Sequence, residues 1–318
     1  PVDPKLIGAD PAFRAALDAL WPSISPPAHV DDLLTRADRL ARAADGVLDP
    51  EEQSRLLRAA ARSRGQVPWT HADLALVDEA RHLIEGHTST YGHVVVDEAQ
   101  DLSPMELRMI ARRAPAGSVT ILGDLAQATA AWEHDSWADV IAYLPAPDGA
   151  MTRELQLGYR APGQVLDLAA RLLPVAAPNI TPTRSVREGK RAPRVIAVAL
   201  DDLFAAAARE VALLADEGLQ VGCIVAPDDL HDVERALALA GLAYGIAERD
   251  GLAKRITVLG APEAKGLEFD AVVVVEPAAI AADAARGLRL LYVALTRPIQ
   301  HLSIVHARPL PAPLRVTR

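Results

Sequence analysis

The chain has 318 residues, half of them apolar, so it is long enough for two domains with sizeable cores. Its 33 basic and 42 acidic residues give a net charge of −9, which argues against a small nucleic-acid module that works through overall positive charge. No apolar run reaches the length of a membrane span, and the first residues lack a secretory signal pattern. We therefore expect a soluble, cytoplasmic protein without membrane contact.

Residues 1–88 are predicted to be helical, because apolar residues recur at helical spacing in "FRAALDALW", "VDDLLTRADRLARAA" and "LALVDEARHLI". Asp49 and Pro50 have the residue types of an N-cap and a first helical position. His71 is interpreted as a surface residue of a first helical turn, since no partner at metal-ligand spacing stands nearby. We find no catalytic constellation in this region.

From residue 91 onward, short apolar strands alternate with helices, a pattern typical of parallel sheets that helices cover on both faces. Strands are predicted over 93–97, 118–124, 194–200, 221–227, 256–260, 270–277 and 301–307. Helices are predicted over 103–113, 138–144, 163–173, 203–218, 231–241 and 288–297. Cys223, the only cysteine, lies in "VGCIVAP", the strand predicted over 221–227, and is expected to fill the core.

The predicted fold class is therefore α/β, with one partial and one complete parallel sheet and an N-terminal helical region. The expected division is residues 1–88, 89–150 and 151–318. Only two strands fall before residue 150, so we expect the other strands of the first sheet to precede residue 1. Residues 174–194 carry five basic residues and one acid among many prolines. A solvated linker is the favoured interpretation, and a contact with nucleic acid or protein is the alternative.

The stretch "VVVDEAQDLSPMEL" ends an apolar strand on adjacent carboxylates. Ser103, Pro104 and Glu106 fit the start of a helix with a capping box, but they leave Asp97 and Glu98 unexplained. In doubly wound sheets, ligands bind beyond the carboxyl ends of the strands. Asp97 is suited to hold Mg²⁺ together with substrate phosphates, and Glu98 to take a proton from an attacking water. The pattern indicates a Walker B element.

This stretch resembles motif II of the UvrD/Rep group of superfamily 1 helicases, and further stretches resemble later motifs in the family's order. "TILGDLAQAT" resembles motif III, which implies that Asp124 and Gln127 couple the γ-phosphate to the translocation surface. "LQLGYRAPGQVLDLA" resembles motif IV, which implies that Tyr159 stacks on adenine and that Arg160 reaches the γ-phosphate. The resemblance also implies that the two predicted sheets are RecA-like.

"ITVLGAPEAKGLEFDAVVVVEP" resembles motif V, which implies that Lys265, Gly266 and Glu268 lie where nucleotide and nucleic acid meet. "LRLLYVALTRPIQHLSIV" resembles motif VI, which implies an arginine finger at Arg297. Arginine suits both phosphate-facing positions, because it is always charged and can donate two parallel hydrogen bonds to phosphate oxygens. Trp132 could stack on a base, as the motif III aromatic does in relatives that track on DNA; a packing role for Trp132 and Trp137 is the alternative.

No G-x-x-x-x-G-K-[ST] stretch occurs, so a P-loop that would cradle phosphates is absent from the sequence. We expect the chain to be the C-terminal part of a larger motor that uses ATP and Mg²⁺, and to be inactive on its own. "GDLAQAT" and "TRSVREG" resemble helicase IV or HelD-type proteins, which bind RNA polymerase and recycle it from nucleic acid. RNA polymerase and nucleic acid are thus the partners implied. The alternatives are a UvrD/Rep-type DNA repair helicase and a non-catalytic binding fragment.

Overall fold

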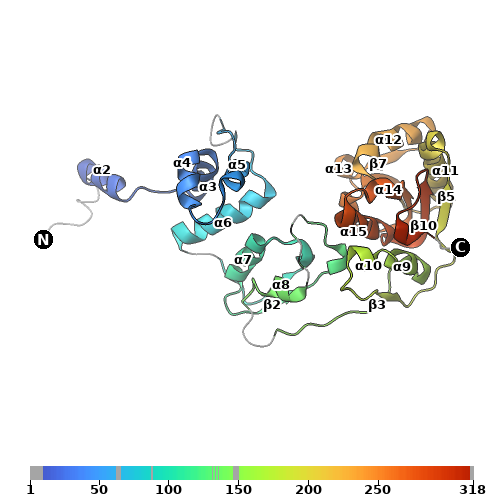
Figure 1. Cartoon of the computed structure of the whole chain (residues 1–318), viewed down its shortest axis with the longest axis horizontal. Helices are drawn as coiled ribbons and strands as arrows, with labels where there is room; N and C mark the ends of the chain where they lie inside the picture. The colour runs from blue at the N-terminus through green and yellow to red at the C-terminus, as the bar shows by residue number, and fades with distance from the viewer. Residues whose placement is uncertain are drawn as a thin grey trace. The chain divides into compact units, whose positions relative to one another are not determined.

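The computed structural model describes residues 10–61, 66–86, 89–130, 132, 134, 136–145 and 150–315. The chain forms two compact units. The helical unit comprises residues 1–94, 103–120 and 143–145, and the sheet unit comprises 95–102, 121–142 and 146–318. Figure 1 labels several elements of each unit. The predicted division into 1–88, 89–150 and 151–318 stays a prediction.

Within the described residues, the helical unit contains six helices, two of which begin at the predicted caps. They are α2 (Pro11–Leu20), α3 (Pro26–Thr35), α4 (Ala37–Ala43), α5 (Pro50–Leu56), α6 (His71–Glu85) and α7 (Pro104–Arg113). Asp49 and Ser103 begin α5 and α7 with capping boxes, as predicted. A small core of Val30, Leu34 and Ala80 lies between α3 and α6. The helical character predicted for the N-terminal region is confirmed within the described residues.

Ion pairs connect α6 to α7. Asp78 and Glu79 on α6 pair with Arg112, and Asp78 also accepts a hydrogen bond from Arg113 at 2.7 Å. The Arg112 side chain is only 10% exposed, and those of the two acids are 12% and 16% exposed. Because these charges are largely withdrawn from water, each depends on its partners far more than a surface ion pair would.

The partial sheet consists of β1 (Val94–Val96) and β2 (Val119–Ile121) within the described part of the chain. The Val94 amide donates to the Ser118 carbonyl at 3.1 Å, and the Leu122 amide donates to the Val96 carbonyl at 2.8 Å. The bonds advance in the same direction along both strands, so the strands are parallel.

The complete sheet has six strands in the order β5-β10-β9-β6-β8-β7, and every neighbouring pair is parallel. The strands are β5 (Arg194–Ala197), β6 (Val221–Val225), β7 (Tyr244–Ile246), β8 (Ile256–Gly260), β9 (Phe269–Val275) and β10 (Pro298–His306). A further parallel pair joins β3 (Leu157–Gly158) to β4 (Arg184–Ser185). The α/β class with a complete parallel sheet is confirmed.

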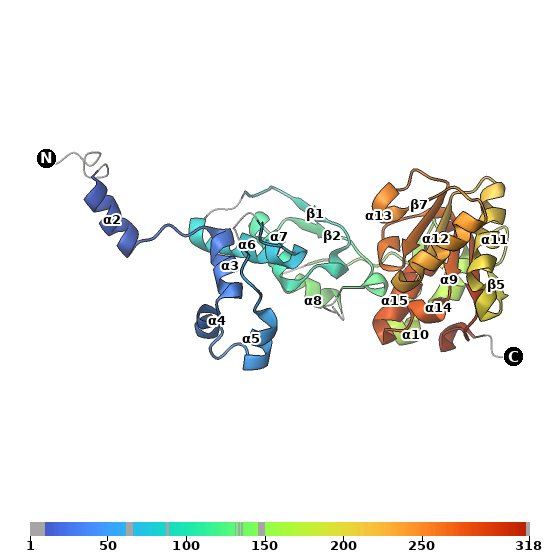
Figure 2. The same ribbon diagram turned by 90° about the horizontal axis from the view of Figure 1, so that it is seen from above.

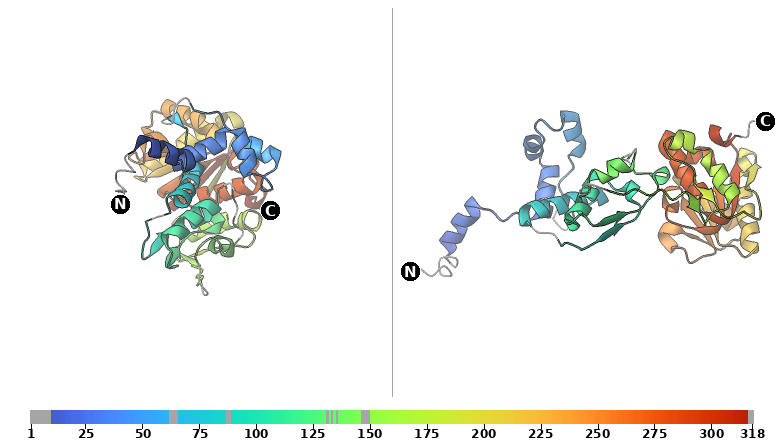
Figure 3. Two further views of the ribbon diagram at one scale, coloured as in Figure 1. Left: turned by 90° about the vertical axis from the view of Figure 1, so that its left-hand side faces the viewer. Right: turned by 90° about the horizontal axis from the view of Figure 1, so that it is seen from below.

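Helices cover both faces of the six-stranded sheet, and the side-chain alternation of its strands explains why (Figures 2 and 3). Val272 and Val274 of β9 face a core with α9 (Gly163–Ala170), α10 (Leu173–Ala176) and α15 (Ala284–Leu295). Ala271, Val273 and Val275 face a second core with α11 (Leu203–Asp216) and α12 (Leu230–Leu239). A strand buried on both faces must be apolar, and "AVVVV" at residues 271–275 meets that demand.

The structure refines several predicted boundaries. The helix predicted over 163–173 is divided into α9 and α10, and residues 174–194 hold the end of α10 and all of β4, so they are not simply a solvated linker. The edge strand β7 was not predicted, because three residues after a glycine-containing turn carry little periodicity. Short helices α8 (Trp137–Ile141), α13 (Ala247–Asp250) and α14 (Pro277–Ile280) complete the unit.

Cys223 is fully buried in β6, as its apolar surroundings predicted. Burial raises the pKa of its thiol to about 12. Within the described residues, no helix combines the length and the apolar character that crossing a membrane requires.

Candidate functional site

The adjacent carboxylates Asp97 and Glu98 stand directly after β1, and both side chains are exposed. Glu98 has a left-handed backbone (φ 54°, ψ 33°), which is rare for a residue with a side chain. The turn is stabilised by the Asp97 side chain, whose Oδ1 accepts a hydrogen bond from the Glu98 amide at 2.9 Å. The chain therefore uses an unfavourable conformation to turn Glu98 away from the strand direction at the sheet edge.

Gln100 connects this turn to the stretch that follows β2. Its side chain is completely buried. Nε2 donates to Glu98 Oε2 at 2.6 Å, and Oε1 accepts from the Asp124 amide at 3.0 Å. Gly123 leaves room for this link, because a Cβ at that position would collide with Gln100 Oε1 and with the Trp137 ring. One buried amide thus fixes the distance between the two polar stretches.

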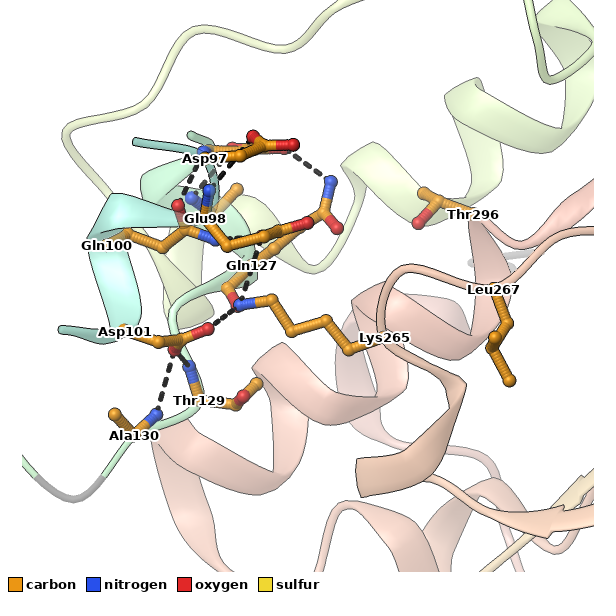
Figure 4. A network of polar contacts seen from close by, with 12 residues as sticks. Asp97, Glu98, Gln100, Asp101, Gln127, Thr129, Ala130, Lys265, Leu267 and Thr296 are labelled. Atoms are coloured by element: carbon orange, nitrogen blue, oxygen red, sulfur yellow. Dashed lines mark hydrogen bonds and ion pairs between the residues drawn. The ribbon is translucent and has the colours of Figure 1, made fainter. Parts of the chain in front are cut away.

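Lys265 joins the same group from the loop after β8 (Figure 4). Its ammonium pairs with Asp101 Oδ2, donates to the Gln127 carbonyl at 2.7 Å, and lies 3.5 Å from Glu98 Oε2. Burial lowers the pKa of Lys265, and the Glu98 carboxylate opposes that shift. Gly266 follows with φ +73°, a left-handed turn that glycine adopts without strain.

Gln127 links the site to Arg297 at the end of α15. Its Nε2 donates to Asp124 Oδ2 at 2.7 Å, and its Oε1 accepts from an Arg297 terminal nitrogen at 2.9 Å. Arg297 is 4% exposed and also donates to the Val293 carbonyl at 3.0 Å. Burial lowers the pKa of Arg297, and the positive charge of Arg160 lowers it further. A guanidinium remains charged under all such conditions.

Arg160 and Glu268 form a direct ion pair, with 2.6 Å between NH2 and Oε1. Tyr159 is 69% exposed, so its ring is available for stacking. Arg187 braces this strand end by donating to the Arg160 carbonyl at 2.7 Å and, at 3.5 Å, to that of Tyr159. The structure thus brings Arg160 and Glu268 together and places Arg160 close enough to Arg297 for the two charges to interact.

A hydrogen bond from its ring nitrogen holds Trp132 in place. Its indole N–H donates to the Asp101 carbonyl at 2.9 Å, while Asp101 Oδ1 accepts from the backbone amides of Thr129 and Ala130 at 2.9 and 3.2 Å. These contacts favour the packing interpretation of Trp132 over base stacking. They also show a role for Asp101 that the sequence pattern did not reveal, namely as the common partner of Lys265 and of the 129–130 backbone.

Carboxylates and arginines in this arrangement fit Mg²⁺ and phosphate groups. Among the described residues, no cationic side chain pairs with Asp97, so its oxygens are suited to a hard cation. Among the described residues, no cluster offers three acidic, histidine or cysteine ligands. Arg160 and Arg297 supply the donors that an anionic phosphoryl group requires.

Sequence comparison gives one family match. Residues 261–305 match the UvrD-like helicase C-terminal domain. This stretch contains Lys265, Gly266, Glu268 and Arg297, and it covers β9, α15 and most of β10. It is therefore similar to a helicase C-terminal domain over the part of the sheet unit that carries these four predicted site residues. No curated protein matches the chain.

Three solved structures resemble the chain in fold. The C-terminal domain of a possible DNA helicase from Lactobacillus plantarum WCFS1 is 21% identical, with 49% of this chain and 92% of that chain covered and a TM-score of 0.40. The PRRSV helicase is 16% identical, with 70% and 36% covered and a TM-score of 0.40. The Arterivirus nonstructural protein 10 helicase is 17% identical, with 69% and 40% covered and a TM-score of 0.37. This chain thus spans well under half the length of either viral helicase.

Proposed function

We propose that the chain is the C-terminal part of an ATP-dependent superfamily 1 motor, with ATP and Mg²⁺ as its cofactors. The observation that carries the proposal is the continuous polar connection from Glu98 through Gln100, Asp124 and Gln127 to Arg297. It joins the proposed water-activating acid to the proposed arginine finger through two glutamine side chains and Asp124. The family match over residues 261–305 supports the same class.

The role proposed for each residue follows from the chemistry of its side chain. Bound Mg²⁺ would be held by Asp97 and would neutralise charge on the phosphates. The Gln100 amide donates to Glu98 Oε2, and the Lys265 ammonium lies 3.5 Å from the same oxygen, so Oε1 is the oxygen suited to accept a proton from water. Arg160 and Arg297 stabilise negative charge on the phosphoryl group, and Gln127 orients Arg297. Tyr159 stacks on adenine, while Gly266 and Glu268 border the nucleotide.

For the whole protein, we propose RNA polymerase as the partner and nucleic acid as the track from which it is removed. Support comes from the resemblance of "GDLAQAT" and "TRSVREG" to HelD-type proteins. The proposed domain arrangement is an insertion-like helical region at 1–88, the end of a first RecA-like domain at 89–150 and a second at 151–318. A cytoplasmic location accords with such a partner.

The catalytic role of Glu98 is tested in the full-length protein. Glu98→Gln keeps the size and shape of the side chain, but the glutamine amide cannot accept a proton. ATP turnover should therefore fall at least 100-fold while nucleotide binding survives. Steady-state turnover and fluorescent-nucleotide titration measure the two effects. Glu248→Gln, an exposed acid on α13, is the matched control. Unchanged turnover in Glu98→Gln would remove Glu98 from the mechanism.

The fragment interpretation makes a separate prediction for this chain by itself. Without a P-loop, the chain should bind ATP weakly and show no turnover above a no-protein blank. Robust turnover that disappears in Glu98→Gln would contradict it.

Partner choice is tested by purification of the tagged full-length protein: co-purification of RNA polymerase supports the HelD-type assignment. ATPase activity that rises strongly with single-stranded DNA, without polymerase, would instead indicate a UvrD/Rep-type repair helicase.

A further inference from the structure

Asp101 binds two parts of the sheet unit that lie far apart in the sequence (Figure 4). One carboxylate oxygen, Oδ1, accepts hydrogen bonds from the backbone amides of Thr129 and Ala130 at 2.9 and 3.2 Å. The other oxygen, Oδ2, pairs with the ammonium of Lys265. The two oxygens have separate partners, so a change that affects only Oδ2 leaves the backbone contacts in place.

The loop that follows Gln127 is also held by two arginines. Arg286, near the start of α15, donates from Nε to the Thr129 carbonyl at 3.0 Å. Arg297, after the end of the same helix, donates to the Gln127 side chain at 2.9 Å. Because neither contact involves the carboxylate or the ammonium described above, the loop keeps these two anchors when that ion pair is broken.

Lys265 lies within reach of two carboxylates. Its side chain is 15% exposed, so the ammonium is largely withdrawn from water and depends on an acidic partner. Asp101 is that partner, whereas Glu98 Oε2 lies 3.5 Å from the ammonium and makes the longer contact. Of the acids that the structure describes, these two are the only ones within 4 Å. Without a negative charge at position 101, Glu98 is the carboxylate that remains for Lys265.

A closer contact with Lys265 would weaken Glu98 as the proposed general base. A positive charge beside a carboxylate favours the ionised form, so the carboxylate takes up a proton less readily. A general base works best when its proton affinity is matched to the pH of the reaction. The distance between the Lys265 ammonium and Glu98 therefore affects how well Glu98 can take a proton from water.

We propose that Asp101 is a positioning residue of the ATPase site: by binding the Lys265 ammonium, it keeps that charge from closing on Glu98. The inference rests on the proposed function, because it takes Glu98 to be the base. Asp101 acts only through Lys265 and takes no part in the proton transfer itself.

Asp101→Asn in the full-length protein is the first test. Asparagine Oδ1 still accepts from the Thr129 and Ala130 amides, but the asparagine NH₂ group is a donor and cannot bind an ammonium. Lys265 should then move onto Glu98. The single-turnover rate of ATP hydrolysis should fall about fivefold or more, and the acidic limb of its pH profile should shift to lower pH by about 0.5 unit or more. The affinity for a fluorescent nucleotide should change less than about twofold.

Two further variants show whether the effect depends on the ammonium. Lys265→Gln removes the positive charge from beside Glu98, so the acidic limb should shift to higher pH, opposite to Asp101→Asn. Asp101→Asn combined with Lys265→Gln should hydrolyse ATP about threefold or more faster than Asp101→Asn alone, whereas a merely structural loss would persist or worsen. Asp216→Asn, an exposed acid at the end of α11 on the other face of the sheet from α15, is the matched control.

Thermal unfolding checks that each variant folds. If Asp101→Asn does not fold, the acidic limb of Lys265→Gln still decides the question. An unshifted limb in Lys265→Gln, limbs that shift in the same direction in both single variants, or a double variant no faster than Asp101→Asn would overturn the proposal. Glu98→Gln separates this proposal from the proposed function. Normal turnover in Glu98→Gln refutes both, whereas lost turnover there, together with any of the three results above, refutes only the role of Asp101.

Discussion

At the scale of single residues, two glutamine amides organise the charged groups of the site. Gln100 faces Glu98 with its NH₂ group, and Gln127 faces Asp124 in the same way, so each amide turns its donor toward an acid. The side-chain oxygen of Gln127, Oε1, then accepts a hydrogen bond from Arg297. A carboxylate in place of either amide would meet a neighbouring acid instead, which is why the neutral dipole suits these positions.

The buried thiol of Cys223 gives a prediction for alkaline pH. Its pKa is raised from 9.0 to about 12 in the folded chain, so the unfolded state loses this proton first. The stabilising contribution is complete below pH 9 and decreases between pH 9 and 12, by about 1.4 kcal/mol per pH unit. Urea unfolding at pH 8, 9.5 and 10.5 should show a smaller alkaline decrease for Cys223→Ala than for the wild type. Parallel curves for the two proteins would refute this.

At the scale of elements, the close fit of β6 against β9 predicts a sensitive glycine. A Cβ added to Gly222 would lie 2.5–2.8 Å from the Phe269 ring, which is itself fully buried. Gly222→Ala should therefore lower the free energy of unfolding by about 1–3 kcal/mol, since the packed core cannot accommodate the extra methyl group. Chemical denaturation measures the change. The double variant with Phe269→Leu should recover part of the loss.

Gly92→Ala provides the matched control, because nothing lies within 4 Å of a Cβ at that position. We expect its effect to stay within about 0.5 kcal/mol. An equal loss in both glycine variants would mean that backbone freedom, rather than contact with Phe269, is responsible.

The elements could be predicted from the sequence to the extent that their periodicity is strong. The apolar run 271–275 of β9 and the capping box of Ser103 were visible because burial on both faces and helix initiation each demand particular residue types. The Lys265 contact with Asp101 was not visible, because it joins residues more than 100 positions apart. The catalytic roles of Glu98, Gln127, Arg160 and Arg297 stay predictions. The structure adds that hydrogen bonds through Gln100 and Asp124 connect Glu98, Gln127 and Arg297, whereas Arg160 pairs with Glu268.

At the scale of the whole molecule, the two units should unfold separately. The helical unit has a small core and depends on the buried charges at Arg112, whereas the sheet unit has two extensive apolar cores. Arg112→Leu leaves two partly buried acids without their shared partner and should lower only the first thermal transition. Gly222→Ala should lower only the second. Differential scanning calorimetry resolves the two, and a single transition shifted by both variants would contradict separate unfolding.

The left-handed backbone of Glu98 has a consequence for how this sequence can change. Relieving that conformation with glycine would gain about 1 kcal/mol of folding free energy while deleting the acid on which the proposed chemistry depends. Selection for a well-folded chain and selection for turnover therefore act in opposite directions on this codon. A variant library enriched only for expression would be expected to drift toward glycine there, so the persistence of glutamate at position 98 would report that a lineage still uses the site.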